Sequence, residues 1–172
     1  AQGDAEITKQ IQEHLDEGRR RKDEAELELF KQAVQATATG HARASTFITP
    51  GVTERAIQIE LEAEMFRHGA HGVGYGTIVG VGSHAGVLHF APGDRRVGPE
   101  DLVLIDAGGS INGYTADVTR TYPGGDQFTS EQQAIYDVVL EAEKEGMSQC
   151  KIGTEWHEVH YAAARVMTVG LR

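Results

Sequence analysis

The chain has a single cysteine, four prolines and one tryptophan in 172 residues, and its 16 basic residues are outnumbered by 26 acidic ones. One cysteine excludes an intrachain disulfide and suits a reducing compartment, so we expect a cytoplasmic protein. The net charge of -10 leaves no basic surface for a nucleic acid, and we expect no such partner. No run approaches the roughly 18 apolar residues of a membrane span, so we expect no membrane association.

Helical patterns dominate the chain before Gly72. Residues 5–17 are polar and compatible with a helix, and residues 24–47 predict a longer one. Thr53 is a typical N-cap for a third helix that Gly69 ends. The apolar positions expected to face inward are Leu27, Phe30, Val34 and Ala38 in the second helix, and Ile57, Leu61 and Met65 in the third.

After Gly72 glycines multiply and β-branched residues appear. Short strands are predicted at residues 77–79, 87–90, 102–105 and 118–122, with a turn at 110–113. The connections are too short for helical crossovers, so the strands are expected to be mostly antiparallel. Two further helices follow, one that a Thr129–Gln132 capping box begins and one from Thr154. Helices, an antiparallel sheet and more helices predict the α+β class.

Residues 102–125 place two carboxylates on the arms of one predicted hairpin. Asp106 closes the apolar run from Leu102 to Ile105, and Asp117 lies among Tyr114, Val118 and Tyr122. Two carboxylates brought together in this way repel each other unless a proton or a cation lies between them. Hard oxygen ligands favour manganese, magnesium or a similar divalent ion. Aspartates beside glycines are also common in turns, so the pattern alone leaves a purely structural role open.

The sequence of this hairpin resembles that of a known family. The run IDAGG-x-x-x-GY-x-x-DVTRTYP, residues 105–123, is similar to the metal-binding hairpin of the pita-bread metallopeptidases, and within them to the Xaa-Pro branch of aminopeptidase P and prolidase. The upstream runs YGTIVG (75–80) and LHF (88–90) are similar to the segment with the family's substrate-side histidine. The likeness covers about residues 21–172 and implies the amino-terminal half of a pita-bread catalytic domain.

The resemblance implies a role for individual residues. Asp106 would bind one metal ion and Asp117 would bridge two. The resemblance implies manganese as the ion, with cobalt or zinc as alternatives. His89 would be catalytic and would contact the substrate carbonyl. The remaining expectations are that His84 touches substrate or is structural, and that Tyr75 and Thr119 support the metal ligands from behind.

The implied activity is hydrolysis of the Xaa-Pro bond, in dipeptides or at peptide amino termini, by a hydroxide that bridges two divalent ions. The family's remaining ligands, one histidine and two glutamates, follow later in its sequences. We therefore expect residues 1–20 to be the tail of another domain or a linker helix, residues 21–172 to be a first half-domain without activity alone, and the complete protein to be a homodimer. Two alternatives stay open: a non-catalytic module that binds a peptide or a partner, and a methionine aminopeptidase, which the Arg120-Thr121-Tyr122 tail disfavours.

Overall fold

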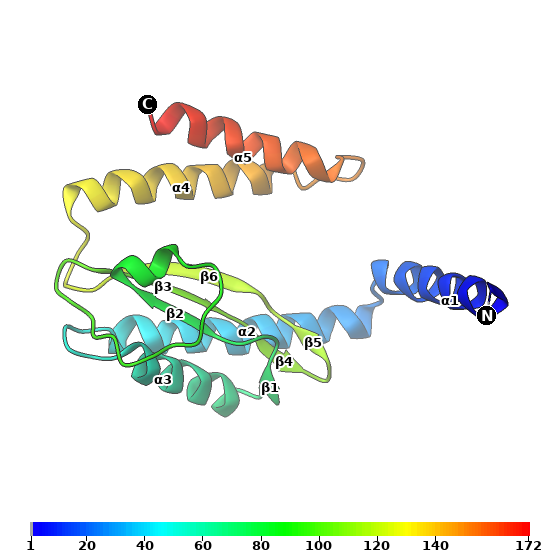
Figure 1. Ribbon diagram of the computed structural model, residues 1–172, viewed down its shortest axis with the longest axis horizontal. Coiled ribbons are helices and arrows are strands. Elements are labelled where there is room, and N and C mark those ends of the chain that lie inside the picture. The colour runs from blue at the N-terminus through cyan, green and yellow to red at the C-terminus, as the bar shows by residue number, and fades with distance from the viewer. Residues whose placement is uncertain (1) are drawn as a thin grey trace. The chain divides into compact units, whose positions relative to one another are not determined.

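The computed structural model describes residues 2–172 and divides the chain into two compact units, residues 1–124 and 125–172. In the first unit, helices α1 (Gln2–Arg20), α2 (Glu24–Phe47) and α3 (Glu54–Arg67) precede the strands (Figure 1). Asp23 and Glu26 form a capping box at the start of α2, and the Thr53 side chain caps α3 as predicted. None of the described helices combines the length and apolarity that crossing a bilayer requires.

The strands of the first unit form two small antiparallel sheets. One has the order β2 (Ile78–Val81), β3 (Leu102–Ala107) and β6 (Val118–Pro123), and the other β1 (Gly72–Val73), β4 (Gly109–Ile111) and β5 (Tyr114–Thr115). A two-residue turn with positive φ at Asn112 and Gly113 joins β4 to β5, within the turn predicted at residues 110–113. The predicted antiparallel α+β class is confirmed.

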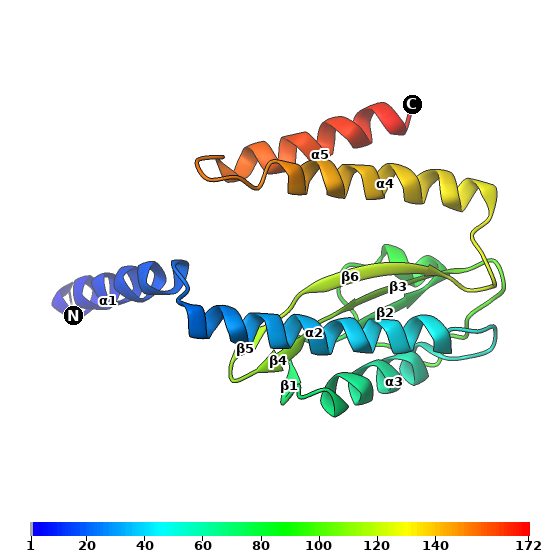
Figure 2. The same ribbon diagram turned by 180° about the vertical axis from the view of Figure 1, so that it is seen from behind.

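The core lies between the sheets and the two helices α2 and α3, which pack side by side (Figure 2). Along β3 every second side chain is buried against the helices, and Asp106 belongs to the other set. Strand alternation therefore places Asp106 on the sheet face away from α2 and α3.

The predicted inner face of α3 is confirmed, whereas that of α2 is wrong at three of its four positions. The exception is Phe30, which is partly buried and packs edge-on against Tyr114 of β5. Leu27 and Val34 are about half exposed, and Ala38 is exposed. Gly40 shows the reason, because a Cβ there would lie 2.6 Å from Met65 Cγ in α3. The helices approach so closely that small residues fill the contact. The buried face of α2 consists of Ala33, Ala36, Thr37, Gly40, His41 and Ala44.

The strand predicted at residues 87–90 is absent. A short 3₁₀ helix, η1 (Gly82–Gly86), follows β2 instead, and the chain then runs irregularly, with Leu88 85% exposed. Val87 to Phe90 have side chains typical of strands but no neighbouring strand to pair with. The local pattern therefore predicts a strand that does not form.

The second unit is an antiparallel pair of helices, α4 (Ser130–Ser148) and α5 (Trp156–Gly170) (Figure 1). The predicted Thr129–Gln132 capping box begins α4. Ala142 and Gly146 in α4 and Ala162 in α5 are buried where the two helices meet.

Candidate functional site

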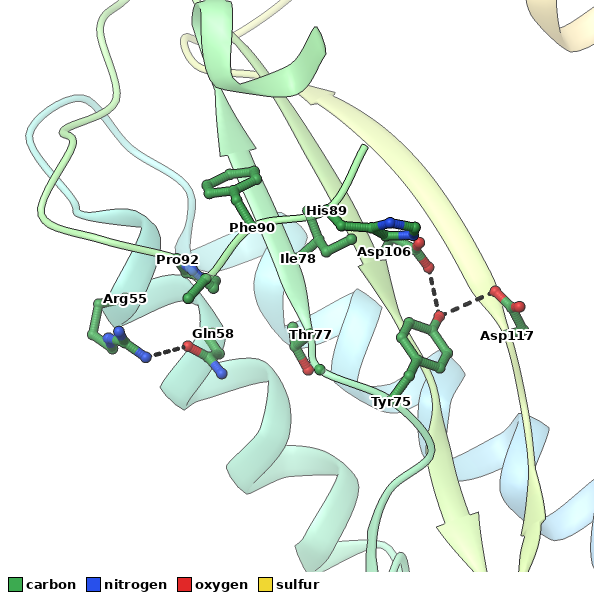
Figure 3. Close-up of a pocket in the computed structure, with 12 residues that line it drawn as sticks. Arg55, Gln58, Tyr75, Thr77, Ile78, His89, Phe90, Pro92, Asp106 and Asp117 are labelled. Atoms are coloured by element: carbon green, nitrogen blue, oxygen red, sulfur yellow. Dashed lines mark hydrogen bonds between the residues drawn. The ribbon is translucent and has the colours of Figure 1, made fainter. Parts of the chain in front are cut away.

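A pocket of about 690 Å³ opens on the face of the first unit that carries Asp106 (Figure 3). Tyr75, His89, Asp106 and Asp117 line one side of it, and Arg55 and Gln58 of α3 line the other. Ile78, Phe90 and Pro92 supply apolar wall between them. The pocket thus brings four of the predicted site residues together.

The two aspartates reach the pocket from neighbouring strands. Asp106 lies in β3, opposite Thr119 of β6, and Asp117 lies just before β6 begins. At Gly108, which follows β3, a Cβ would lie 1.7 Å from the carbonyl oxygen of Ala116. Only glycine allows this approach of the two backbones, and the approach sets the two aspartates beside each other.

Tyr75 joins the two carboxylates. Its hydroxyl lies 2.5 Å from Asp106 Oδ1 and 3.1 Å from Asp117 Oδ1 (Figure 3). Burial, and then the hydrogen bonds and charges of Asp106 and Asp117, raise the pKa of the Tyr75 phenol above its usual value, so the phenol stays protonated and donates. A single neutral donor leaves most of the paired negative charge uncompensated.

This arrangement fits the oxygen-rich part of a divalent metal site. Asp106 and Asp117 each direct one oxygen toward a common point, the Tyr75 hydroxyl, and hard carboxylate oxygens suit ions such as manganese. Among the described residues no cluster of three or more histidine, cysteine, aspartate or glutamate side chains is placed to hold an ion. The described part of the chain therefore offers two ligands to such a centre and not a complete set.

The two histidines predicted for the site lie in different surroundings. His89 is exposed on the irregular segment after η1 and lines the pocket. His84 lies within η1, and its Nδ1 is 2.7 Å from Oε1 of the buried Glu54. His84 is not part of the pocket wall, so the structure places it behind the site; its contact with substrate stays a prediction.

Thr119 is exposed on β6, directly opposite Asp106 in the register. Its backbone carbonyl accepts a hydrogen bond from Arg120. Its predicted support of a metal ligand stays a prediction.

Sequence reasoning missed three buried polar residues around the site. Glu54 is fully buried, Thr77 is 3% exposed and lines the pocket, and His41 is 5% exposed behind β6. His41 Nε2 donates to the Val118 carbonyl at 3.1 Å, which leaves Nδ1 to accept from the Tyr122 hydroxyl at 3.2 Å. The partners of Glu54 and His41 lie 27 to 81 positions away along the chain, so no local pattern distinguishes these two from ordinary surface residues. The buried Thr77 hydroxyl has no hydrogen-bond partner in the described part of the chain.

Comparison with known proteins identifies the family of the chain and agrees with its fold. The model of the metallopeptidase family M24 matches residues 28–172. The Xaa-Pro aminopeptidase of Escherichia coli is 38% identical over 146 residues, which are 85% of this chain and 33% of that protein. The structure of aminopeptidase PepP from Pseudomonas aeruginosa superposes with a TM-score of 0.85 and 39% identity, covering 87% of this chain and 34% of that one.

A second structure bears on the metal. A zinc-substituted E. coli aminopeptidase P in complex with product aligns with a TM-score of 0.84 and 38% identity, again over 87% of this chain and 34% of the other. The chain thus spans about a third of the length of its relatives and corresponds to one half of the pita-bread catalytic fold. Both the family match and this degree of identity show that the chain belongs to the metallopeptidase family M24.

Proposed function

We propose that this chain supplies the first two metal ligands and the substrate-side histidine of a metallopeptidase that cleaves the Xaa-Pro bond. The observation that carries the proposal is the convergence of Asp106 and Asp117 on one point at the wall of an open pocket. The relatives named as Xaa-Pro aminopeptidases support the choice of bond.

Asp106 and Asp117 would hold the ions, with Asp117 in the bridging position. Divalent ions held by these carboxylates would supply a hydroxide nucleophile and polarise the scissile carbonyl. The carboxylate of Asp117 suits a bridge because its two oxygens can each serve one cation. The Tyr75 phenol, held in its protonated form, would keep both carboxylates oriented.

His89 would act on the substrate from beside the two aspartates (Figure 3). Its imidazole is on the wall that also contains Asp106, where it can donate to the substrate carbonyl or to the tetrahedral intermediate. Apolar wall from Ile78, Phe90 and Pro92 offers contact area for a proline ring.

The test is turnover of Ala-Pro-Ala, Ala-Pro and Met-Ala-Ser by the manganese-loaded full-length enzyme that contains this chain. Cleavage of at least one proline peptide is expected: cleavage of Ala-Pro-Ala marks an aminopeptidase, and cleavage of Ala-Pro alone marks a dipeptidase. A preference for Met-Ala-Ser would establish the methionine aminopeptidase alternative. Binding of Ala-Pro-Ala without cleavage would establish the non-catalytic module.

The 172-residue chain alone is expected to be inactive, because the described residues offer two carboxylates and no third ligand. Its predicted domain limits (1–20 and 21–172), a homodimer, a cytoplasmic location and manganese as the ion remain part of the proposal. Light scattering of the full-length enzyme tests the dimer, and metal analysis of enzyme purified without added ions tests manganese.

A further inference from the structure

We propose that Glu54 and His84 are a pair of positioning residues that hold the segment 82–92, and with it His89 and Phe90, against the pocket. The contacts of the pair stand on the structure alone. The effect on turnover rests on the proposed function, because His89 must act on the substrate for its position to matter.

Glu54 is the first residue of α3 and has no solvent exposure. A carboxylate is costly to bury unless donors surround it, and here three do. Oε1 accepts from the Val81 amide at 3.1 Å and from His84 Nδ1 at 2.7 Å, and Oε2 accepts from the Gly93 amide at 3.0 Å. The amino-terminal end of α3 also favours a negative charge at this position.

These three donors bracket one stretch of chain. Val81 ends β2, His84 lies in η1, and Gly93 follows the irregular segment. The stretch therefore leaves the sheet at Val81 and returns to α3 at Gly93, and both ends are bound to the Glu54 carboxylate. The Arg55 amide also donates to the Gly93 carbonyl at 3.0 Å, which fixes the return.

His84 connects this anchor with the pocket wall. Its ring packs edge-on against the Phe90 ring, with centroids 5.3 Å apart and an interplanar angle of 66°. Phe90 lines the pocket beside His89 (Figure 3). A displacement of the His84 ring would therefore move the residue next to the substrate-side histidine.

The bond from His84 needs only a donor at Nδ1, which both the neutral and the protonated imidazole can supply. An asparagine places its amide nitrogen at about the same distance from the backbone as Nδ1. His84→Asn should therefore preserve the anchor, whereas His84→Leu should remove it at similar volume. The side chain of His84 is 43% exposed, so neither change empties the core.

The first measurement is amide hydrogen exchange, residue by residue, on the 172-residue chain. We expect His84→Leu to speed exchange in residues 82–93 by about tenfold or more, the change that follows from losing one hydrogen bond to a charged group. His84→Asn should exchange like the wild type. His68→Leu is the matched control, because His68 is a 45% exposed histidine that contacts Glu64 away from the pocket.

The second measurement is steady-state cleavage of Ala-Pro-Ala by the full-length metal-loaded enzyme. His84→Leu should lower kcat by roughly 10- to 100-fold, the loss typical of a misplaced reacting group, with metal affinity unchanged. His84→Asn should restore kcat. Glu54→Gln, which keeps the size of the side chain and removes its charge, should act like His84→Leu.

The outcomes separate this inference from the proposed function. Unchanged exchange in residues 82–93 of His84→Leu, or faster exchange spread evenly over the whole first unit, would overturn the positioning role. Unchanged kcat despite a loosened segment would overturn its catalytic consequence. Failure of the wild-type enzyme to cleave Xaa-Pro peptides would instead overturn the proposed function, while the exchange experiment would still decide whether the pair anchors the segment.

Discussion

The strands that carry the two aspartates and the segment that carries His89 line the same pocket, but different contacts hold them. Asp106 lies within a ladder of six registered residue pairs between β3 and β6. His89 lies on a stretch without strand partners, which is held at both ends by the Glu54 carboxylate and, at Gly93, also by the Arg55 amide. The two aspartates of the proposed metal site therefore depend on backbone pairing, whereas the segment with His89 depends largely on a few long-range contacts to Glu54.

The largest expected effect comes from breaking the backbone side at Gly108. Gly108→Ala would drive a Cβ into the Ala116 carbonyl, so β3 and the approach to β6 must separate. We expect a loss of about 3 kcal/mol in the free energy of unfolding, at the upper end of overpacking costs. Urea denaturation measures it. Gly72→Ala, where a Cβ meets nothing within 4 Å, is the control and should change stability far less.

The next effect concerns the metal ligands. Asp117→Asn should weaken binding of manganese to the full-length enzyme by at least roughly 100-fold, because the amide lacks the charge of the proposed bridging ligand. This loss exceeds the one typical of residues that only support a ligand. Isothermal titration calorimetry measures the affinity. Asp126→Asn, a change at an exposed aspartate of the second unit, should leave it unaltered. Equal affinities for all three proteins would contradict the assignment of Asp117.

A smaller effect is expected at Tyr75. Tyr75→Phe removes the hydroxyl that joins the two carboxylates, so they must be brought together by the ions alone. We expect roughly tenfold weaker manganese binding, as for the loss of a contact behind a metal ligand. The opposite result, tighter binding by the variant, would show that the phenol competes with the ions for the carboxylates.

The smallest expected effect is the pH dependence of stability that comes from His41, which is buried behind β6. Burial lowers the pKa of His41, and the charge of Arg120 lowers it further. The Val118 carbonyl, Ala107 and Asp106 raise the pKa, but burial outweighs them. Because the unfolded chain then binds a proton more readily than the folded one, stability should fall as the pH drops below the ordinary histidine pKa of about 6.5. His41→Gln should lack this part of the decline in pH-dependent urea melts. A parallel decline in both proteins would mean that His41 does not contribute.

The same division explains what could be predicted from the sequence. The paired aspartates and the α+β order follow from local signals: an apolar run that ends in Asp106, glycines at turns, and capping residues such as Thr53. The anchor of the His89 segment could not be predicted, since Glu54 resembles any acidic residue in the first turn of a helix. Its three donors lie 27 to 39 residues further along the chain.

Two errors have the same origin. Residues 87–90 have the composition of a strand, but Leu88 is exposed and no strand lies beside it. The spacing of apolar residues in α2 predicts one inner face, yet close packing against Met65 buries a neighbouring face of alanine and glycine. In both cases the local sequence allows more than one structure. The missing partner strand decides the first case, and the contact with α3 decides the second.

The return of the chain to Glu54 has a further consequence for how such a site can diversify. Because both ends of the stretch between Val81 and Gly93 are fixed at one carboxylate, residues can be inserted or exchanged between them at little entropic cost, since closing a longer loop becomes only slowly more difficult. The exposed tip at Val87 and Leu88 is where such changes would be accommodated. A change of length at this tip thus leaves the two ends of the stretch, and the register of the sheet that presents Asp106, unaltered.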